Sequence, residues 1–391
     1  MYLNALFNPM KIVIAPDSYK ESLSAPKVAE AILEGFKPHF LEANFIVTPL
    51  SDGGEGMIAA LKSNLSGSTL VPRQVTNPLG KKIKASFLIL KDKKTAVIEM
   101  AEASGLRLVS INKRDPLKTT SFGTGELIRC ALDQGCRKFI IGLGGSATCD
   151  GGIGALTALG VIFKHKSENL KFPFASDLLR ISSVNTKRMD PRLLDAEFIL
   201  AHDVINPLLG IKGALLYAPQ KGASIKQLDF LNRAFEHYNL ILSKIAKKNI
   251  GNIPGTGSAG GLAAGLYTFL NAKLKPGSSV FMEKINFRQK IRNANLIITG
   301  EGQIDFQTIF GKTPCSVASI AKEFNIPVIA IAARLGPGYH EVYRQGIDAV
   351  FSITNGPLSK TQALKQCRPL LIDAASNIAR LFKLGESTNH G

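Results

Sequence analysis

Acidic side chains recur in one setting along the chain: each follows a short apolar run and stands among glycines or beside a lysine. The four segments are DSYK at 17–20, SDGGEG at 51–56, GGSATCDGG at 144–152 and GEGQ at 300–303. An apolar run followed by such a turn and an amphipathic segment is typical of a buried strand that leads into a helix. Glycine lets the backbone approach a ligand closely, and unpaired N–H groups at a helix start favour anions.

Together the four turns indicate a site for phosphate groups and a metal ion, because ligands of open α/β sheets bind at the carboxyl ends of the strands. Phosphoryl transfer needs donors around the phosphates, Mg²⁺ held by carboxylates, and a group that orients the attacking hydroxyl. The candidate acids are Asp17, Asp52, Glu55, Asp150, Asp203, Glu301 and Asp305, and the candidate cations are Lys20 and Lys312. For any single turn, the alternative that glycine merely ends a strand stays open.

Common local motifs do not account for these turns. GKT at 311–313 looks like the end of a P-loop, but Phe306 stands where that motif needs glycine. GTGSAG at 255–260 matches GxGxxG, yet no strong strand precedes it and Val280 replaces the expected acid. The absence of GxSxG argues against an α/β hydrolase. No histidines pair at i, i+3 or i+4, so a histidine-based metal site has no local support.

The composition is that of a folded protein, with 45% hydrophobic and 20% charged residues among 391. At roughly 150 residues per domain, two domains are expected. The 48 Lys and Arg against 30 Asp and Glu give a net charge of +18, but no aromatic-rich strand is interleaved with the basic residues. Nucleic acid is therefore not an expected partner. No apolar run reaches the roughly 18 residues of a membrane span, so no membrane association is expected either.

The cysteines and the N-terminal residues bear on the location of the protein. Five cysteines form no CxxC pair, and residues 1–9 lack the basic start and long apolar stretch of a secretory signal. These features predict reduced thiols and a cytoplasmic protein. Residues 1–9 are expected to be a loose extension.

The elements that must position the acids follow from hydrophobic periodicity. Strands are expected at 11–16, 45–50, 69–75, 83–90, 96–100, 138–142 and 197–201, and helices after Ser24, at 57–64, from a cap at Thr124, at 225–247 and up to 270. Three successive strands without a helix predict antiparallel or mixed pairing. The last third alternates strands at 295–299, 327–332 and 349–353 with helices at 314–324, 339–345 and 358–384.

This βαβαβα series predicts a parallel sheet with helices on both faces. Residues 11–64 show the same open α/β pattern. We therefore expect two unlike α/β domains: one built from both chain ends, residues 10–76 plus 285–391, and one inserted mixed-sheet domain, residues 77–284.

The chain resembles the bacterial class I glycerate kinases (glycerate 2-kinases) from Met10 to about Leu384. Eight blocks in order carry the resemblance: KIVIAPDSYKE at 11–21, PLSDGGEGM at 49–57, AVIEMAEASGL at 96–106, TSFGTGELI at 120–128, IIGLGGSATCDGGI at 140–153, DVINPLLG at 203–210, APQKGA at 218–223 and IITGEGQID at 297–305. The resemblance implies a flavodoxin-like domain, a smaller inserted domain and an active site between them. It also implies Mg²⁺- and ATP-dependent phosphorylation of D-glycerate to 2-phosphoglycerate.

On that basis the site residues take roles. Asp203, Lys20 and Asp52 are expected to be catalytic, with Asp203 orienting the attacking 2-hydroxyl and Lys20 pairing with the carboxylate of glycerate. The other expected substrate contacts are Asp17, Ser18, Ser51 and Asn206. The expected nucleotide contacts are Gly144, Gly145, Ser146, Ala147, Gly300, Gly302 and Lys312. Glu301 and Asp305, with Asp203, are expected to hold Mg²⁺, partly through water.

Four positions depart from the residues usual in the family: Cys149 (usually Asn), Ile205 (usually Asp), Gln303 (usually Arg) and Arg334 (usually small). Ile205 matters most, because losing a carboxylate could remove a metal or hydroxyl contact. Arg334 is a candidate to supply the positive charge that Gln303 lacks.

Three other functions stay open at this stage. Phosphorylation at the 3-hydroxyl would give 3-phosphoglycerate, and the sequence does not separate the two acceptor oxygens. A nucleotide-dependent oxidoreductase and a non-catalytic nucleic-acid binder are more remote. A homodimer is left open.

Overall fold

The computed structural model describes residues 9–388, and these form two compact units. The first unit contains the chain up to Asp52, Ala59–Asn64, and the chain from Ser278 onward. The second unit contains Gly53–Ile58 and Leu65–Gly277. All but Pro9 of the expected N-terminal extension lies outside the described residues.

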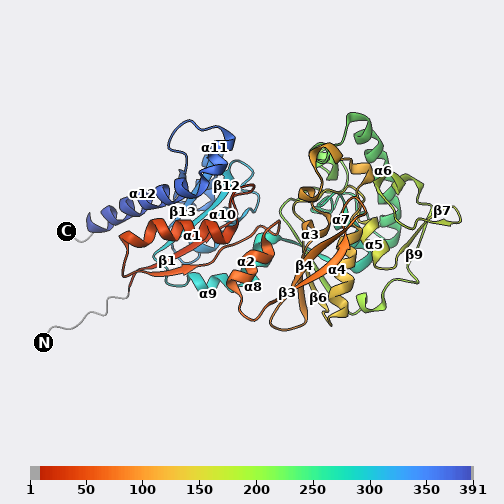
Figure 1. Cartoon of the computed structure of the whole chain (residues 1–391), viewed down its shortest axis with the longest axis horizontal. Coiled ribbons are helices and arrows are strands. Elements are labelled where there is room, and N and C mark those ends of the chain that lie inside the picture. The colour runs from red at the N-terminus through yellow and green to blue at the C-terminus, as the bar shows by residue number, and fades with distance from the viewer. Residues whose placement is uncertain (1–8, 389–391) are drawn as a thin grey trace. The chain divides into compact units, whose positions relative to one another are not determined.

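A five-stranded sheet forms the centre of the first unit (Figure 1). Its strands are β1 (Lys11–Pro16), β2 (Asn44–Val47), β12 (Leu296–Ile304), β13 (Val328–Leu335) and β14 (Ala349–Ser352). The order is β14-β13-β12-β1-β2, and every neighbouring pair is parallel. Counted in order of appearance, this is the 2-1-3-4-5 arrangement of flavodoxin-like folds. The flavodoxin-like fold class expected from the sequence is confirmed.

The α-helices near this sheet in the sequence are α1 (Ala25–Phe36), α2 (Met57–Asn64), α8 (Gly277–Lys284), α9 (Phe287–Ile291), α10 (Thr313–Lys322), α11 (Lys360–Lys365) and α12 (Cys367–Thr388). Of these, α1, α10 and α12 pack against strands of the sheet. Helices α1 and α12 lie against each other and share a core with Ile12 and Ile298. Gly35 permits this approach, since a Cβ there would lie 2.6 Å from the Ile372 carbonyl oxygen. Right-handed crossovers place α1 and α10 on opposite faces of the sheet.

The second unit contains a six-stranded mixed sheet in the order β11-β10-β6-β5-β4-β3. Its strands are β3 (Thr69–Thr76), β4 (Lys82–Ile89), β5 (Thr95–Glu99), β6 (Lys138–Gly142), β10 (Glu197–His202) and β11 (Lys273–Pro276). Strand β4 is antiparallel to both neighbours, whereas β5, β6, β10 and β11 run parallel. The mixed pairing expected from three successive strands is confirmed. A small antiparallel sheet contains β7 (Ile162–His165), β8 (Glu168–Asn169) and β9 (Ser183–Asn185).

Five α-helices belong to the second unit's described residues: α3 (Ala101–Ser104), α4 (Phe122–Asp133), α5 (Ile153–Ala158), α6 (Ile225–Ala246) and α7 (Leu262–Leu270). Helix α6 begins at a capping box in which the Ser224 and Gln227 side chains each accept from the other residue's backbone N–H. Within residues 9–388, none of the helices combines the length and the apolar character that crossing a membrane requires.

The boundaries between the two units differ from the expected ones. Strand β3 pairs along its whole length with β4, so residues 65–76 belong to the second unit and not to the first. The later boundary falls after Gly277 instead of residue 284. The first difference arises because strand pairing, which hydrophobic periodicity does not reveal, decides where β3 belongs.

Local predictions also need correction at helix ends. Ser24 occupies the N-cap position of α1 but makes no capping hydrogen bond. Helix α4 begins after Ser121, so Thr124 lies inside it. Residues 339–345 form a 3₁₀ helix, and the long terminal helix is divided at Gln366 into α11 and α12.

The largest correction concerns residues 300–303. The sequence predicts a turn there, but β12 continues to Ile304 because these residues pair with Ile331–Leu335 of β13. Gly300 allows this pairing, since a Cβ would lie 2.1 Å from the Ile331 carbonyl oxygen. Gly300 and Gly302 therefore lie in a strand and not at a helix start.

Candidate active site

The first unit places its acids at the carboxyl edge of the sheet, between β1 and β12. Asp17 directly follows β1, and Glu301 lies near the end of β12. The chain leaves these two neighbouring strands in opposite directions, toward β2 and toward β13. Such a switch point is where open α/β sheets bind ligands. A cavity of about 860 Å³ opens here, and we call it the switch-point cavity. Its charged lining residues are Asp17, Lys20, Glu21, Asp52, Glu301, Lys312, Arg334 and Lys360.

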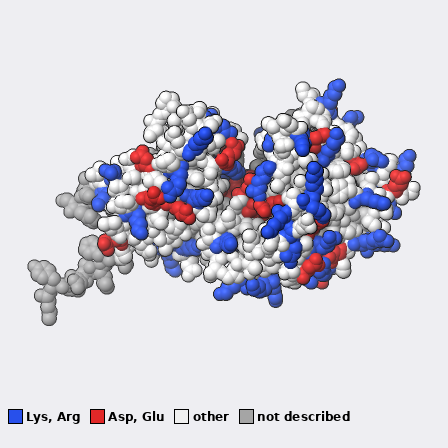
Figure 2. All heavy atoms as spheres, viewed as in Figure 1, with Lys and Arg blue, Asp and Glu red and all other residues white. Residues whose placement is uncertain are grey.

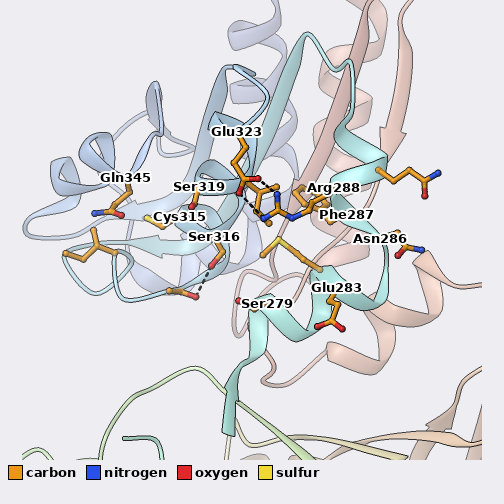
Figure 3. Close-up of a pocket in the computed structure, with 15 residues that line it drawn as sticks. Ser279, Glu283, Asn286, Phe287, Arg288, Cys315, Ser316, Ser319, Glu323 and Gln345 are labelled. Atoms are coloured by element: carbon orange, nitrogen blue, oxygen red, sulfur yellow. Dashed lines mark hydrogen bonds and ion pairs between the residues drawn. The ribbon is translucent and has the colours of Figure 1, made fainter. Parts of the chain in front are cut away.

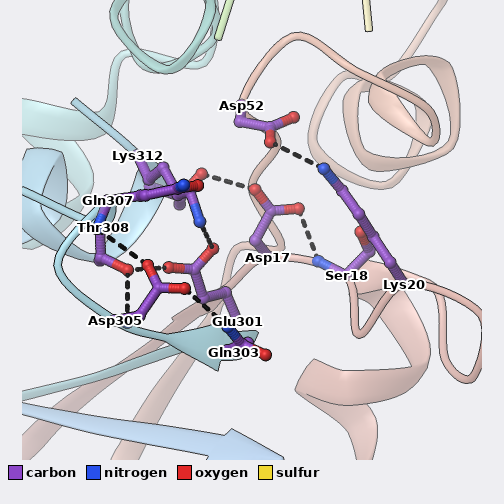
Figure 4. Close-up of polar contacts among 11 residues, drawn as sticks. Asp17, Ser18, Lys20, Asp52, Glu301, Gln303, Asp305, Gln307, Thr308 and Lys312 are labelled. Carbon is purple, nitrogen blue, oxygen red and sulfur yellow. Dashed lines mark hydrogen bonds and ion pairs between the residues drawn. The ribbon is translucent and has the colours of Figure 1, made fainter. Parts of the chain in front are cut away.

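Asp17 is a buried carboxyl group held by two donors (Figure 4). One oxygen accepts from the Ser18 backbone N–H at 2.6 Å, and the other accepts from the Thr313 hydroxyl at 2.6 Å. Burial, with the nearby charge of Asp52, raises the pKa of Asp17 to about 7. A carboxyl group with that pKa can accept a proton at neutral pH.

Lys20 and Asp52 form an ion pair at the cavity, with 3.4 Å between Lys20 Nζ and Asp52 Oδ2. The Asp52 side chain is 10% exposed, whereas that of Lys20 is 68% exposed. Ion pairs with one solvated partner contribute little free energy. The Lys20 ammonium can therefore turn toward an anionic ligand at small cost.

Glu301 is the second largely desolvated carboxyl group of the cavity, with a side chain that is 13% exposed. Its Oε1 accepts from the Thr308 hydroxyl at 2.7 Å, and its Oε2 lies 3.7 Å from Lys312 Nζ. Burial raises the pKa of Glu301 to about 7, and Lys312 and Thr308 oppose that rise in part. Lys312 reaches Glu301 because it occupies the N-cap position of α10.

Asp305 holds the loop after β12. Its two oxygens accept from the Gln303 amide at 2.6 Å and from the Gln307 backbone N–H at 2.9 Å (Figure 4). Within residues 9–388, no three His, Cys, Asp or Glu side chains gather in a way that could hold a metal ion. The expectation that Asp203, Glu301 and Asp305 hold Mg²⁺ therefore remains a prediction.

Gln303 and Arg334 are two of the positions that depart from the family. They lie opposite each other in the β12–β13 register, and both line the switch-point cavity. Opposite residues of neighbouring strands project from the same face of a sheet. Arg334 therefore brings a guanidinium to the same side of the sheet as Gln303.

The second unit holds the other predicted nucleotide contacts in the segment between β6 and α5, residues 143–152, which we call the glycine loop. The loop is fastened at Gly145, whose carbonyl accepts from Leu106 N–H, and at Ala147, whose N–H donates to the Ser104 carbonyl. Within residues 9–388, the N–H groups of Gly144, Gly145 and Ser146 have no acceptor. Successive unpaired N–H groups form a concavity that suits an anion.

Asp150, a sequence candidate in the same loop, is a structural anchor. Its carboxylate accepts from the backbone and hydroxyl of Ser121 and from the N–H groups of Gly152 and Gly154, at 2.7 to 3.3 Å. It therefore fixes the starts of α4 and α5 and has little capacity left for a ligand.

Asp203 and Asn206 follow β10 in the second unit. Asp203 is half-buried, and the Asn206 amide donates to the Lys212 carbonyl. Ile205, between them, is 60% exposed. The structure brings Asp17, Lys20, Asp52, Glu301 and Lys312 together in one cavity, while the roles assigned to Asp203, Asn206 and Ser51 remain predictions.

Several supporting side chains were missed by the sequence analysis. Thr308 and Thr313 donate to the two buried acids, and Glu99 accepts from Gly56 and Ile58 N–H at 3.1 and 2.6 Å. Burial raises the pKa of Glu99 to about 7. Only Thr313 had a usable signal, since it follows Lys312 in the GKT segment.

A second cavity of about 750 Å³ lies in the first unit beside α8, α9 and α10 (Figure 3). Of its charged lining residues, Glu283, Arg288 and Glu323, the last two pair with each other. It contains none of the predicted site residues, so we do not assign it to the site.

An α/β protein with buried acids at a switch point and an anion-binding loop is typical of phosphate-handling enzymes. A sequence profile described as "Glycerate kinase family" matches residues 12–383. The chain belongs to the glycerate kinase family, and it is a kinase.

Named relatives and a solved structure agree with this family. A protein of Halalkalibacterium halodurans named "Glycerate kinase" is 44% identical over 379 residues, which is 96% of this chain and 99% of that protein. An Escherichia coli protein named "Glycerate 2-kinase" is 44% identical over 377 residues, again 96% and 99% of the two chains. A crystal structure provisionally described as glycerate kinase 2 of Salmonella typhimurium has a TM-score of 0.84 and 41% identity, covering 97% of this chain and 100% of that one.

Proposed function

We propose that the protein transfers the γ-phosphoryl group of ATP to the 2-hydroxyl of D-glycerate and produces 2-phosphoglycerate. The names of the relatives support the substrate, and the name "Glycerate 2-kinase" of the E. coli relative favours the 2-hydroxyl. The observation that carries the proposal is the pair of buried acids, Asp17 and Glu301, flanked by Lys20 and Lys312 in the switch-point cavity.

In this proposal D-glycerate binds in the switch-point cavity of the first unit. Lys20 pairs with the substrate carboxylate, because its ammonium is exposed at the cavity. Asp17 accepts the hydroxyl proton as the oxygen bonds to the γ-phosphorus and the bond to ADP breaks. Asp203 keeps its predicted part in orienting the hydroxyl.

The phosphates of ATP are proposed to bind the unpaired N–H groups of the glycine loop, with Lys312 as a further cationic contact. Mg²⁺ that arrives on ATP phosphates needs only one or two protein carboxylates. Glu301 suits that part, because a cation would neutralise a carboxylate that burial otherwise disfavours. The cation would offset phosphate charge during transfer.

The direct test is an ATP-coupled assay with D-glycerate, followed by separation of 2- and 3-phosphoglycerate. We expect turnover that needs ATP and a divalent cation, with 2-phosphoglycerate as the product. Exclusive formation of 3-phosphoglycerate would establish the alternative acceptor oxygen. Protection against thermal unfolding by NADH but not by ATP would instead favour the oxidoreductase.

A further inference from the structure

Lys221 is a buried cation beside the glycine loop. It ends a 3₁₀ helix, Pro219–Lys221, and is 5% exposed. Its Nζ donates to the Ser146 hydroxyl and to the Thr148 carbonyl, both at 2.7 Å. Lys221 thus holds the loop at two points, on either side of Ala147.

The Lys221 charge has no direct counterion. Among the described residues, no carboxylate lies within 4.0 Å of its ammonium. Asp150 is near enough to act electrostatically, but its oxygens are already occupied by Ser121, Gly152 and Gly154. Burying an unpaired ammonium is costly, so buried lysines ordinarily have a carboxylate or a bound anion as partner.

Two further polar groups at this place lack a hydrogen-bond partner among the described residues. An ammonium has three donors, and the two hydrogen bonds of Lys221 leave one unused. The Thr148 hydroxyl oxygen is buried and has no partner among the described residues. With the unpaired N–H groups of residues 144–146, the loop presents donors and positive charge without a matching acceptor.

We propose that Lys221 is a positioning residue for phosphate binding: it fixes the glycine loop through Ser146 and Thr148, and its charge attracts the polyphosphate tail that the loop N–H groups bind. This inference rests on the proposed function, because the polyphosphate is taken to be that of ATP. It adds a residue to which the sequence analysis gave no role.

The test compares Lys221→Met with Lys226→Met. The control removes the same charge from the second unit but at an exposed position of α6. Binding of tripolyphosphate and of ATP is measured by titration calorimetry, and KM and kcat are measured for both substrates. For Lys221→Met we expect affinity for tripolyphosphate to fall on the order of tenfold or more, as for a lost charge-assisted contact. KM for ATP should rise with it, while KM for D-glycerate stays within about twofold.

The control should bind tripolyphosphate within about twofold of wild type. A folded Lys221→Met protein that binds tripolyphosphate as tightly as wild type would overturn the inference. If Lys221 had a purely structural role, Lys221→Met would lower the stability and the affinities for both substrates together. That result would also contradict the inference.

Ser146→Ala covers the case in which Lys221→Met does not fold. This variant removes one Lys221 acceptor and leaves the charge in place, so we expect roughly threefold weaker tripolyphosphate binding at near-normal stability. Unchanged binding would overturn the inference. The proposed function has a separate test, because it fails if the wild-type protein does not phosphorylate D-glycerate. The role of Lys221 is decided by tripolyphosphate binding in either case.

Discussion

Asp17 and Glu301 reach a similar pKa with different partners. Both are buried, and both accept a hydrogen bond from a threonine hydroxyl. The negative charge of Asp52 raises the pKa of Asp17 further, whereas the positive charge of Lys312 lowers the pKa of Glu301 in part. The difference suits the proposed roles, because Asp17 must gain and lose a proton while Glu301 must meet a positive charge.

Replacing Asp17 by Asn should change how stability depends on pH. Its pKa is raised from 3.8 to about 7 by burial, so the unfolded chain ionises first as pH rises. The free energy of unfolding of the wild-type protein therefore falls by up to about 4 kcal/mol as pH rises from 3.8 to about 7, and it stays lowered by that amount above pH 7. Asp17→Asn lacks this loss, so its Tm relative to wild type should increase from pH 4 to pH 7.5 in calorimetric scans.

Asp229→Asn, at an exposed carboxyl group of α6, is the matched control for Asp17→Asn. Its Tm difference from wild type should stay constant over the same pH range. A constant difference for Asp17→Asn as well would show that Asp17 is not held in a desolvated state.

Thr313→Val should shift the pH profile of the reaction. Removing the hydroxyl takes away a hydrogen bond that lowers the pKa of Asp17, so the proton acceptor would ionise at higher pH. We expect activity to rise with pH through about 7 in wild type, and the midpoint of kcat/KM to move upward by roughly one unit in the variant.

Thr299→Val is the control for the pH profile, because the Thr299 hydroxyl donates to the Ala15 carbonyl and not to a carboxylate. It should lower stability and leave the midpoint in place. Equal midpoints for wild type and Thr313→Val would contradict the role of Asp17 as proton acceptor.

The individual acids could be found from the sequence, but their supports could not. Asp17, Asp52 and Glu301 stand out because each follows an apolar run beside glycine or lysine. No local sequence pattern distinguishes Thr308, and its contact with Glu301 depends on how the chain turns after β12. The anchoring role of Asp150 was missed for the same reason: its four donors come from two helix starts.

At the scale of elements, the glycine loop depends on backbone conformations that need glycine. Gly145 has φ +75°, and a Cβ there would lie 2.5 Å from Glu55 Oε1. Gly145→Ala should therefore strain the backbone of the loop and push against the Glu55 side chain, raise KM for ATP on the order of tenfold, and cost about 1–2 kcal/mol of stability. Steady-state kinetics and thermal unfolding measure the two effects.

Gly135→Ala is the control that adds backbone strain without a contact at the glycine loop. Gly135 has φ +84°, but an added Cβ would meet nothing within 4 Å. This variant should lose similar stability and keep the wild-type KM for ATP. If both variants kept that KM, the glycine loop would not be the phosphate site.

The elements themselves were predictable to different degrees. Strand β1 was predicted with its observed bounds because its apolar run is bounded by charged residues. Strand β12 was predicted too short, since Gly300 and Gly302 read locally as a turn. The pairing of β12 with β13 outweighs that local preference, and such pairing between distant segments is what periodicity does not contain.

At the scale of the whole molecule, the net charge of +18 comes from 48 Lys and Arg against 30 Asp and Glu. On the face seen in Figure 2, Lys and Arg are spread over both units and interspersed with Asp and Glu. A diffuse positive field of this kind attracts small anions over a Debye length of about 10 Å at 0.1 M salt. Both proposed substrates are anions, so the positive charge of the protein would favour their binding. The charge therefore does not require a nucleic-acid partner.

Raising the ionic strength should therefore weaken substrate capture and leave the chemical step alone. From 0.05 to 0.5 M KCl, we expect KM for ATP to rise by more than KM for D-glycerate, because ATP carries more charge, while kcat changes by less than about twofold. Sucrose at matched viscosity is the control and should raise neither KM. A fall in kcat with both KM values constant would mean that salt acts on the folded state or on transfer itself, and the diffuse field would then have no part in binding.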